Sequence, residues 1–152
     1  MAAGAGHGRS CDVDSVPQAA WNRAIGAFHD IHHEQTSAVG TVRQNSTPST
    51  LPLSESGIVV AGARVVIVTP PGFKSGLAFL RYGPLWRRCD RDADLDIYRA
   101  IVAALVEEYC ERRGHCLTIV PRPHPEFYER ECEVLADHGF AVRAGPPILI
   151  VI

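Results

Sequence analysis

The feature that most constrains the fold is a run of alternating strand and helix patterns between Gly76 and Gly139. The run predicts a strand over 76–82, a helix over 94–113, a strand over 115–120 and a helix over 125–138. Two strands joined through a helix of this length need a right-handed crossover between parallel neighbours. The chain is therefore expected to form an α/β or α+β domain with a mixed, twisted sheet flanked by helices.

The first of the two helices has clear start and stop signals. Asp92 or Asp94 can cap its start, because a short acidic side chain accepts hydrogen bonds from the free N–H groups there. Gly114 can end it in a left-handed conformation. Apolar residues recur between these limits at helical spacing, which predicts one buried face: Leu95, Tyr98, Ile101, Val102, Leu105 and Tyr109.

The second helix is predicted from Pro125, which suits a first helical position, to a stop at Gly139. Its apolar face is expected to be formed by Phe127, Tyr128, Cys132 and Leu135. Beyond it, residues 141–143 and 148–152 have the pattern of strands.

Upstream, residues 58–68 are rich in β-branched side chains and predict a strand, in which Gly62 indicates a bulge or bend. A short strand near 50–53 and a hairpin turn over 54–57 would precede it. Further upstream, apolar side chains spaced three and four residues apart predict a short helix: Trp21, Ile25, Phe28 and Ile31 or His32.

The length of 152 residues suits one domain. Residues 1–17 are small or acidic, without periodicity, and are expected to form a flexible N-terminus. A single domain over 18–152 would follow.

Charge and cysteine content exclude several classes of protein. The net charge of −2 gives no basic excess for DNA or an anionic membrane surface. Five cysteines without a C-x-x-C pair argue against a disulfide framework and a zinc ribbon, and favour a reducing cytoplasm. The N-terminus lacks the apolar run of a secretory signal, and Ile148–Ile152 is too short to cross a bilayer.

Two polar clusters have both a functional and a plain interpretation. Residues 87–92 read RRCDRD and follow a predicted strand, so their arginines could hold a phosphate or carboxylate. The interleaved acids dilute the positive charge and favour a solvated turn instead. His29 and His33 have the spacing of a two-histidine metal site, but without a third ligand they fit a polar helix end better. No metal site is predicted. Nucleophile, Walker and dinucleotide-binding motifs are absent, and no catalytic residue is assigned.

Residues 76–88, which read GLAFLRYGPLWRR, resemble the "GLAYxxxGPxWR" segment of FemA/FemB-like proteins, a branch of the GNAT acyltransferase superfamily. The run DIHHEQT over 30–36, the run VAGAR over 60–64 and the helix that ends in Gly139-Phe140 are also similar to that group. The similarity extends over about residues 20–140.

This resemblance implies a GNAT-like domain that corresponds to the first of the two units in such proteins. Relatives transfer aminoacyl groups from tRNA, or acyl groups from acyl-CoA, to amines in cell-wall or polysaccharide synthesis. In that fold the strand over 77–82 would splay from its neighbour and offer backbone groups to an acyl donor. The residues that would bind donor or acceptor are Arg81, Tyr82, Gly83, Trp86, Arg87 and Arg88.

The chain departs from the family pattern in three ways. CoA-using members carry an R-x-x-G-x-G pyrophosphate loop, whereas the corresponding loop here has the single glycine Gly83 and a proline that removes an N–H donor. Leu135 stands where many members have a tyrosine that acts as general acid; Tyr128, two helical turns upstream, is a weak substitute. The second unit is missing, and the sequence ends at Ile152 within a strand pattern, so the domain is expected to be partial and truncated.

Three functions remain open at this point. The chain could be an acyl or aminoacyl transferase acting on an amine acceptor, either a small molecule or a cell-wall precursor. It could be a non-catalytic GNAT-like binding module that pairs with itself or with a missing second unit. It could also be a non-functional remnant.

Overall fold

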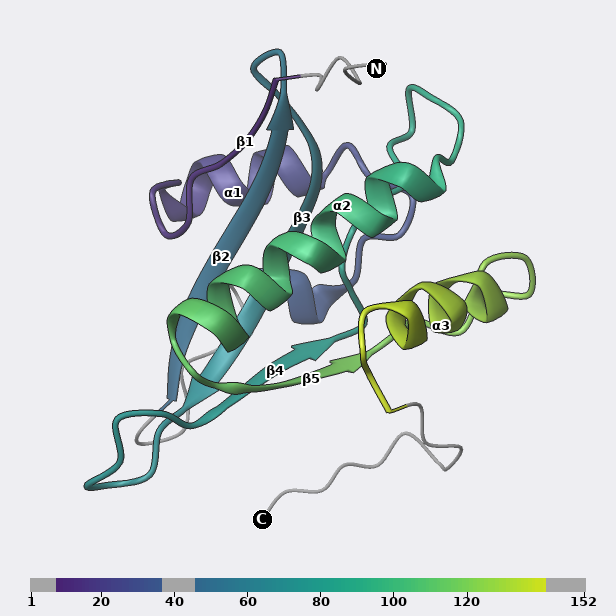
Figure 1. The fold of residues 1–152 in the computed structure, drawn as a ribbon. Helices are drawn as coiled ribbons and strands as arrows, with labels where there is room; N and C mark the ends of the chain where they lie inside the picture. The colour runs from purple at the N-terminus through teal and green to yellow at the C-terminus, as the bar shows by residue number, and fades with distance from the viewer. Residues whose placement is uncertain (1–7, 37–45, 142–152) are drawn as a thin grey trace, which may run out of the picture.

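The computed structural model describes residues 8–36 and 46–141, which form one five-stranded mixed sheet with helices on both faces (Figure 1). The strands lie in the order β1-β2-β3-β4-β5, and neighbours are antiparallel except β4 and β5, which are parallel. The predicted mixed sheet is therefore confirmed. The strands are β1 (Arg9–Cys11), β2 (Ser46–Glu55), β3 (Ile58–Val68), β4 (Leu77–Arg81) and β5 (Cys116–Val120).

The helix predicted over 94–113 is confirmed as α2 (Leu95–Leu105), continued by the π-helical η2 (Val106–Arg112). Asp94 is its cap, since its side chain accepts from the backbone N–H of Asp96 at 2.9 Å. Gly114 follows the helix with a φ of 70°, the left-handed conformation that glycine adopts without strain.

The second predicted helix begins later than expected, as α3 (Tyr128–Asp137), because residues 125–127 form a turn before it. The helix predicted from Trp21 is α1 (Gln18–Ile25), and it ends before Phe28. Phe28 instead forms an antiparallel bridge with Arg88, which ties this segment to the loop after β4. A short 3-10 helix, η1 (His33–Gln35), follows.

Side chains on β3 alternate between two separate cores on opposite faces of the sheet. Ala61, Ala63 and Val65 face the main core, which α2 and α3 cover. On the other face a smaller core is formed by Trp21, Ile25, Phe28 and Leu85. Figure 1 shows α1 behind the sheet and α2 in front of it.

A bulge or bend was predicted at Gly62, but the bulge lies two residues away. Gly62 pairs in register with Pro52, and the register between β2 and β3 shifts between Leu53 and Ser54, which leaves Val60 as the extra residue. Gly62 is instead a site of close approach: a Cβ there would lie 2.9 Å from Cη2 of Trp21. The smaller core therefore requires glycine because the indole ring lies directly on the strand.

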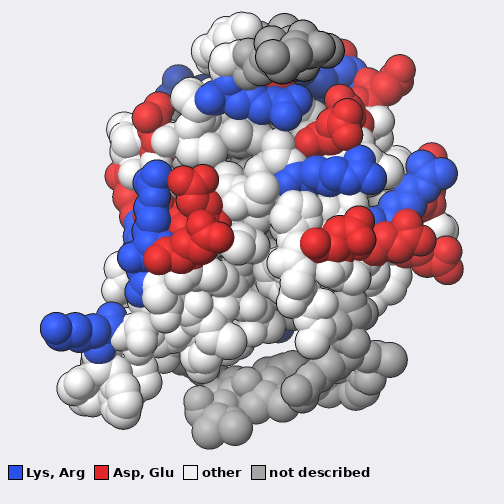
Figure 2. Space-filling view, viewed as in Figure 1, with Lys and Arg blue, Asp and Glu red and all other residues white. Residues whose placement is uncertain are grey.

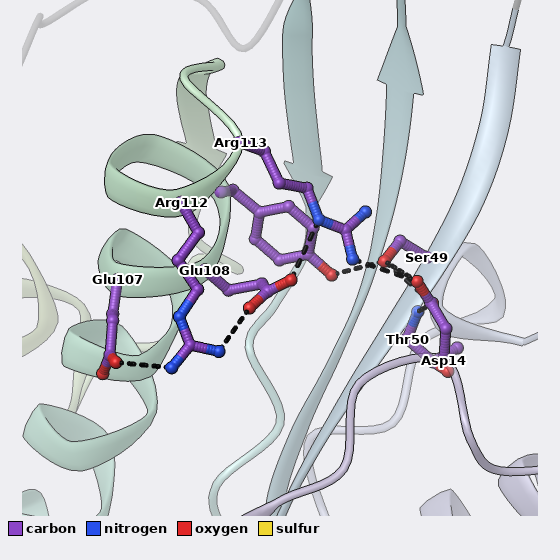
Figure 3. Close-up of polar contacts among 8 residues, drawn as sticks. Asp14, Ser49, Thr50, Glu107, Glu108, Arg112 and Arg113 are labelled. Carbon is purple, nitrogen blue, oxygen red and sulfur yellow. Dashed lines mark hydrogen bonds and ion pairs between the residues drawn. The ribbon is translucent and has the colours of Figure 1, made fainter.

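A polar network fastens the end of α2 and η2 to β2 (Figure 3). The Ser49 Oγ donates to Asp14 at 2.9 Å, so the Tyr109 hydroxyl, 2.7 Å away, must donate to Ser49. Burial raises the pKa of Tyr109 to about 12, which keeps this donor protonated. Arg113 closes the network by bonding both Asp14 and Glu108.

Two expectations for the chain ends have different outcomes. Residues 9–11 were expected to belong to a flexible N-terminus, but Arg9–Cys11 pairs with β2 and is part of the sheet. The strand expected over 148–152 lies outside the described residues. So does the strand expected over 141–143, apart from Ala141, which has no regular structure.

Acidic and basic side chains are interspersed on the face that carries α2 and α3 (Figure 2). No broad patch of one sign is visible there, in keeping with the net charge of −2. Among the described residues, no helix has the length and apolar character needed to cross a membrane.

Candidate functional site

The candidate site lies at the carboxyl ends of the parallel pair β4 and β5. β4 remains paired with β5 up to Arg81 and Val120, and the N–H of Tyr82 also donates to Val120 O at 2.7 Å. The carboxyl ends of adjacent parallel strands are where α/β proteins commonly bind ligands, because loops diverge there and leave a crevice.

The expected splaying of β4 occurs on its other side. β4 pairs with β3 only up to Phe79, and beyond it the side chain of Gln35 is inserted between the two strands. Its Nε2 donates to Arg81 O at 2.8 Å, and its Oε1 accepts from the N–H of Arg64 at 2.7 Å. These backbone groups are therefore satisfied within the protein and are not offered to a ligand.

A pocket of about 510 Å³ opens at this end of the sheet, lined by His29, Arg87, Arg122, Pro123 and His124. No carboxylate is among the lining side chains. Guanidinium groups and imidazoles are donors that suit phosphate and carboxylate oxygens. The lining of the pocket is therefore chemically suited to an anionic ligand.

Contacts with Phe127 and Asp30 hold the side chain of Arg87 in place. Its guanidinium lies over the ring of Phe127, 4.7 Å from the centroid, and its Nε lies 3.7 Å from Asp30 Oδ2. Asp30 is itself fixed, since its carboxylate accepts from the backbone N–H groups of Trp86 and Arg87. Burial raises the pKa of Asp30, and those bonds and Arg87 only partly offset it. The Nε of Arg87 is buried without a hydrogen-bond partner.

Arg122 reaches the pocket from just beyond the end of β5, and its Nη1 donates to Ile31 O at 3.0 Å. The neighbouring His32 ring lies 4.4 Å from that of Tyr82 and 4.1 Å from that of His33. Burial, followed by the charges of His33 and Arg122, lowers the pKa of His32. This imidazole is therefore held neutral beside the arginines.

Arg87 alone among the six sequence-predicted site residues lines this pocket. Arg81 is exposed and forms an ion pair with Glu34 at 3.7 Å, and Tyr82 is half-buried against His32. These two lie beside the pocket, on the same strand end.

The remaining three predicted residues have structural contacts. Gly83 is buried, and a Cβ there would lie 3.0 Å from Leu80 and 3.2 Å from the amide of Gln35. Trp86 is 3% exposed and belongs to the main core. Arg88 bonds to Val59 O and to the carboxylate of Asp90, so the turn interpretation of residues 87–92 fits Arg88.

Four pocket residues were not predicted from the sequence: His29, Arg122, Pro123 and His124. His29 was considered only as a metal ligand with His33, yet α1 ends at Ile25 and the two histidines share no helix face. The described residues contain no group of three or more His, Cys, Asp or Glu placed to hold a metal ion. Arg122 and His124 could have been found, since polar residues just after a parallel strand mark the ligand-binding edge.

A second pocket, of about 320 Å³, lies at the N-terminus of α2. Its apolar floor includes Val60, Trp86 and Ile97, and its polar lining consists of Arg9, Glu55, Arg91, Asp92, Asp94 and Asp96. Four carboxylates against two guanidiniums give this lining an acidic excess. Asp94 also caps this helix end, so the N–H of Asp96 is already hydrogen-bonded to a carboxylate.

Behind Arg87, the core contains a carboxyl group that is almost fully buried. Glu131 on α3 is 8% exposed, and its Oε1 accepts from the indole Nε1 of Trp86 at 2.7 Å. Burial raises the pKa of Glu131 to about 7; Trp86 and Arg87 oppose the shift and Asp30 adds to it. Its Oε2 has no hydrogen-bond partner, nor has the hydroxyl of the buried Tyr98.

Leu135 is 4% exposed and belongs to the main core, so the position of the family's tyrosine is occupied by a packing residue. Tyr128 lies in the first turn of α3 and is 42% exposed. A hydrogen bond to Cys132 raises the pKa of Tyr128, which makes it a poor proton donor near neutral pH.

No protein-family model matches the chain, and no curated protein sequence matches it. Solved structures do resemble it. FemX superposes on 84% of the chain with a TM-score of 0.64 and 10% sequence identity. The chain spans 31% of FemX, which is about a third of its length.

Two acetyltransferases are similar over nearly their whole length. The ribosomal-protein-alanine N-acetyltransferase from Brucella melitensis biovar Abortus 2308 has a TM-score of 0.55 and 10% identity, over 94% of this chain and 98% of that chain. An aminoglycoside acetyltransferase from an uncultured soil metagenomic sample, solved in complex with sisomicin, has a TM-score of 0.56 and 10% identity, over 95% and 96%. The chain therefore has the GNAT acyltransferase fold.

Proposed function

We propose that the chain is an acyl or aminoacyl transferase of the FemA/FemB-like type, acting on an amine acceptor in cell-wall or polysaccharide synthesis. The observation that carries the proposal is the pocket lined by His29, Arg87, Arg122 and His124 at the carboxyl ends of β4 and β5, within a GNAT fold. The five free cysteines favour a cytoplasmic location for this chemistry.

The pocket contains the groups that such a reaction needs. The amine nitrogen of the acceptor forms a bond to the acyl carbonyl carbon, and the bond from that carbon to the carrier oxygen or sulfur breaks. His29 or His124 takes the proton that the amine loses and returns it to the departing oxygen or sulfur, because imidazole is the side chain best suited to exchange a proton near neutral pH. Arg87 and Arg122 hold the anionic carrier so that the carbonyl stays beside the amine.

Acyl-CoA fits this chain poorly as the donor. In CoA-using relatives the pyrophosphate is held by the loop before the helix that corresponds to α2. Here that helix end is capped by Asp94 and lined by Asp92 and Asp96. These carboxylates would repel a pyrophosphate group. We therefore favour aminoacyl-tRNA, whose phosphates would be held in the pocket lined by Arg87 and Arg122.

The resemblance of residues 76–88 to the FemA/FemB-like segment and the similarity to FemX support this branch. We propose that Arg81 and Tyr82, beside the pocket, contact the acceptor, and that Gly83, Trp86 and Arg88 support the loop that presents Arg87. Because the chain spans about a third of FemX, a second GNAT-like unit, or a second copy of this chain, would supply the rest of the acceptor site.

The alternative is a GNAT-like module that binds its ligand without catalysis. The buried Leu135 favours it, since no proton donor stands at that position to protonate a leaving group. Both functions require the pocket, but only the first requires turnover.

An assay with the purified chain separates these functions. Transfer from aminoacyl-tRNA and from acetyl-CoA to an amine-containing cell-wall precursor would be followed as loss of the donor and gain of the acylated product. We expect transfer from aminoacyl-tRNA only, reduced at least about tenfold by Arg87→Ala or Arg122→Ala.

The matched control is Arg112→Ala, because Arg112 is exposed at the far end of η2 and should leave transfer unchanged. Binding of the donor without turnover would support the non-catalytic module. Transfer from acetyl-CoA that survives both pocket substitutions would contradict the proposed site.

A further inference from the structure

The described residues contain one carboxyl group that is buried, incompletely hydrogen-bonded and linked to the pocket without lining it. Glu131 lies on α3, directly behind the loop that presents Arg87. Its Oε1 accepts a hydrogen bond from Trp86, and its Oε2 is buried without a hydrogen-bond partner. Because Glu131 does not line the pocket, it can influence ligand binding only through the residues that lie between it and the pocket.

Two physical links join Glu131 to the pocket. The first is covalent and steric: Glu131 fixes the indole of Trp86, and Arg87 is the next residue along the chain. The Trp86 ring also lies edge-on against Phe127, and the Phe127 ring contacts the guanidinium of Arg87 as well. The second is electrostatic, because the carboxylate and the guanidinium attract each other through a poorly solvated region.

We propose that Glu131 is a proton-linked positioning residue for the pocket: it takes up a proton when an anion binds at Arg87, so that anion binding and acyl transfer depend on its protonation. The inference rests on the proposed function in that Arg87 is taken as the anion-binding residue. It adds a regulator that lies outside the pocket.

The direction of the effect follows from charge. An ionised Glu131 offsets part of the positive field of Arg87 and repels an incoming anion. Once an anion is bound, the field that favours the ionised carboxyl is cancelled, and the neutral form is preferred. Anions therefore bind more tightly when Glu131 is protonated, and affinity falls as pH rises through its titration.

The other titratable groups around Glu131 do not replace it in this role. Asp30 disfavours the ionised form of Glu131, and Arg87 favours it. Cys132 is the next residue on α3. Tyr98 on α2 lies close to Glu131 and stays protonated near pH 7, because burial, followed by the charge of Glu131, raises the pKa of Tyr98. Burial also raises the pKa of Glu131 to about 7, which places its titration in the range where the pocket would work.

The histidines of the pocket would also make anion affinity fall as pH rises, so their contribution must be separated from that of Glu131. The experiment therefore uses a background in which His29→Asn and His124→Asn remove both imidazoles. Sulfate is the probe, since it stays doubly charged across the range from about pH 5.5 to about pH 8.5, and its binding is measured by calorimetry.

In this background we expect sulfate affinity to fall at least about threefold as pH rises across that range. Glu131→Gln should abolish the fall and keep the affinity near its low-pH value, because glutamine stays neutral and can still accept from Trp86. Glu133→Gln, an exposed position on the same helix, should leave the fall unchanged.

A second measurement needs no ligand and stays informative if sulfate binds weakly. The side-chain carboxyl carbon of Glu131 is followed by NMR as a function of pH. Arg87→Ala should move its titration to higher pH, because the cation that favours the carboxylate is removed.

The outcomes separate this inference from the proposed function. If sulfate binds but Glu131→Gln retains the pH dependence, or if Arg87→Ala leaves the Glu131 titration in place, the linkage is overturned and the pocket stands. If sulfate does not bind at any pH, the pocket is not an anion site, and both proposals fail.

Discussion

The indole Nε1 of Trp86 donates to Oε1 of Glu131 at 2.7 Å, and both side chains are buried. This bond joins the loop after β4 to α3, two segments that lie 45 residues apart in the sequence. It holds a carboxyl group in the core at a place where hydrophobic packing would be expected. A buried carboxyl of this kind lowers stability whenever it is ionised.

Replacing Glu131 with glutamine should therefore stabilise the protein at alkaline pH. The folded-state pKa of Glu131, about 7, lies above its ordinary value of 4.5, so between these values the folded chain binds more protons than the unfolded chain. Stability from this group is complete below about pH 4.5 and is lost as pH rises through 7. Glu131→Gln should raise the free energy of unfolding by roughly 3 kcal/mol above pH 8, and by little at pH 4.

Urea unfolding at a series of pH values measures this difference. Glu133→Gln on the exposed face of the same helix is the control and should track the wild-type protein. An equal gain in the free energy of unfolding at pH 4 and pH 8 would mean that the ionisation of Glu131 does not cause the stabilisation.

Gln35 should be important for the stability of the sheet at the point where β4 separates from β3. Gln35→Ala removes three hydrogen bonds and leaves the buried N–H of Arg64 without a partner. We expect a loss of about 2–4 kcal/mol in the free energy of unfolding. Faster hydrogen exchange at the Arg64 amide should accompany it.

Gln35→Met restores most of the volume but none of the bonds, and it distinguishes packing from hydrogen bonding. The account requires the methionine variant to remain destabilised, with rapid exchange at Arg64. A methionine variant as stable as the wild-type protein would show that volume alone matters at this position.

Gly62 should not tolerate even a methyl group. Gly62→Ala places a Cβ 2.9 Å from the Trp21 ring, and we expect this overlap to cost about 1–3 kcal/mol. Gly26→Ala is the matched control: its φ is −61°, its nearest neighbour would be 3.4 Å away, and the change should be neutral or stabilising by up to about 1 kcal/mol. Thermal unfolding of the two variants compares them directly, and equal melting temperatures would refute the close approach.

The order of elements could be predicted because their signals are local. The cap at Asp94, the stop at Gly114 and the apolar spacing between them define α2 within the sequence itself. The role of Gly62 could not be predicted, because it depends on Trp21, which is distant in the sequence and reaches the strand only after folding. A glycine in a strand indicates a bulge and a close approach equally well.

The site could be predicted only in part, because some of its residues come together only after folding. Arg87 was identified because it follows a strand within a distinctive motif. His29 and Arg122 come from segments far apart in the chain. The bridge between Phe28 and Arg88 places His29 beside Arg87, and the parallel pairing of β4 and β5 brings Arg122 to the same pocket. Trp86 was predicted to contact ligand, yet its hydrogen-bond partner is Glu131 on α3.

The central claim is that ligand binds at the carboxyl ends of β4 and β5, and not at the N-terminus of α2. NMR of the whole chain with a hydrolysis-resistant aminoacyl-tRNA mimic, an aminoacyl amide on a short RNA acceptor stem, tests this most directly. The account predicts shifts confined to the surroundings of His29, Arg87, Arg122 and His124, lost in Arg87→Ala. Shifts centred on Asp92, Asp94 and Asp96 that persist in Arg87→Ala would contradict it.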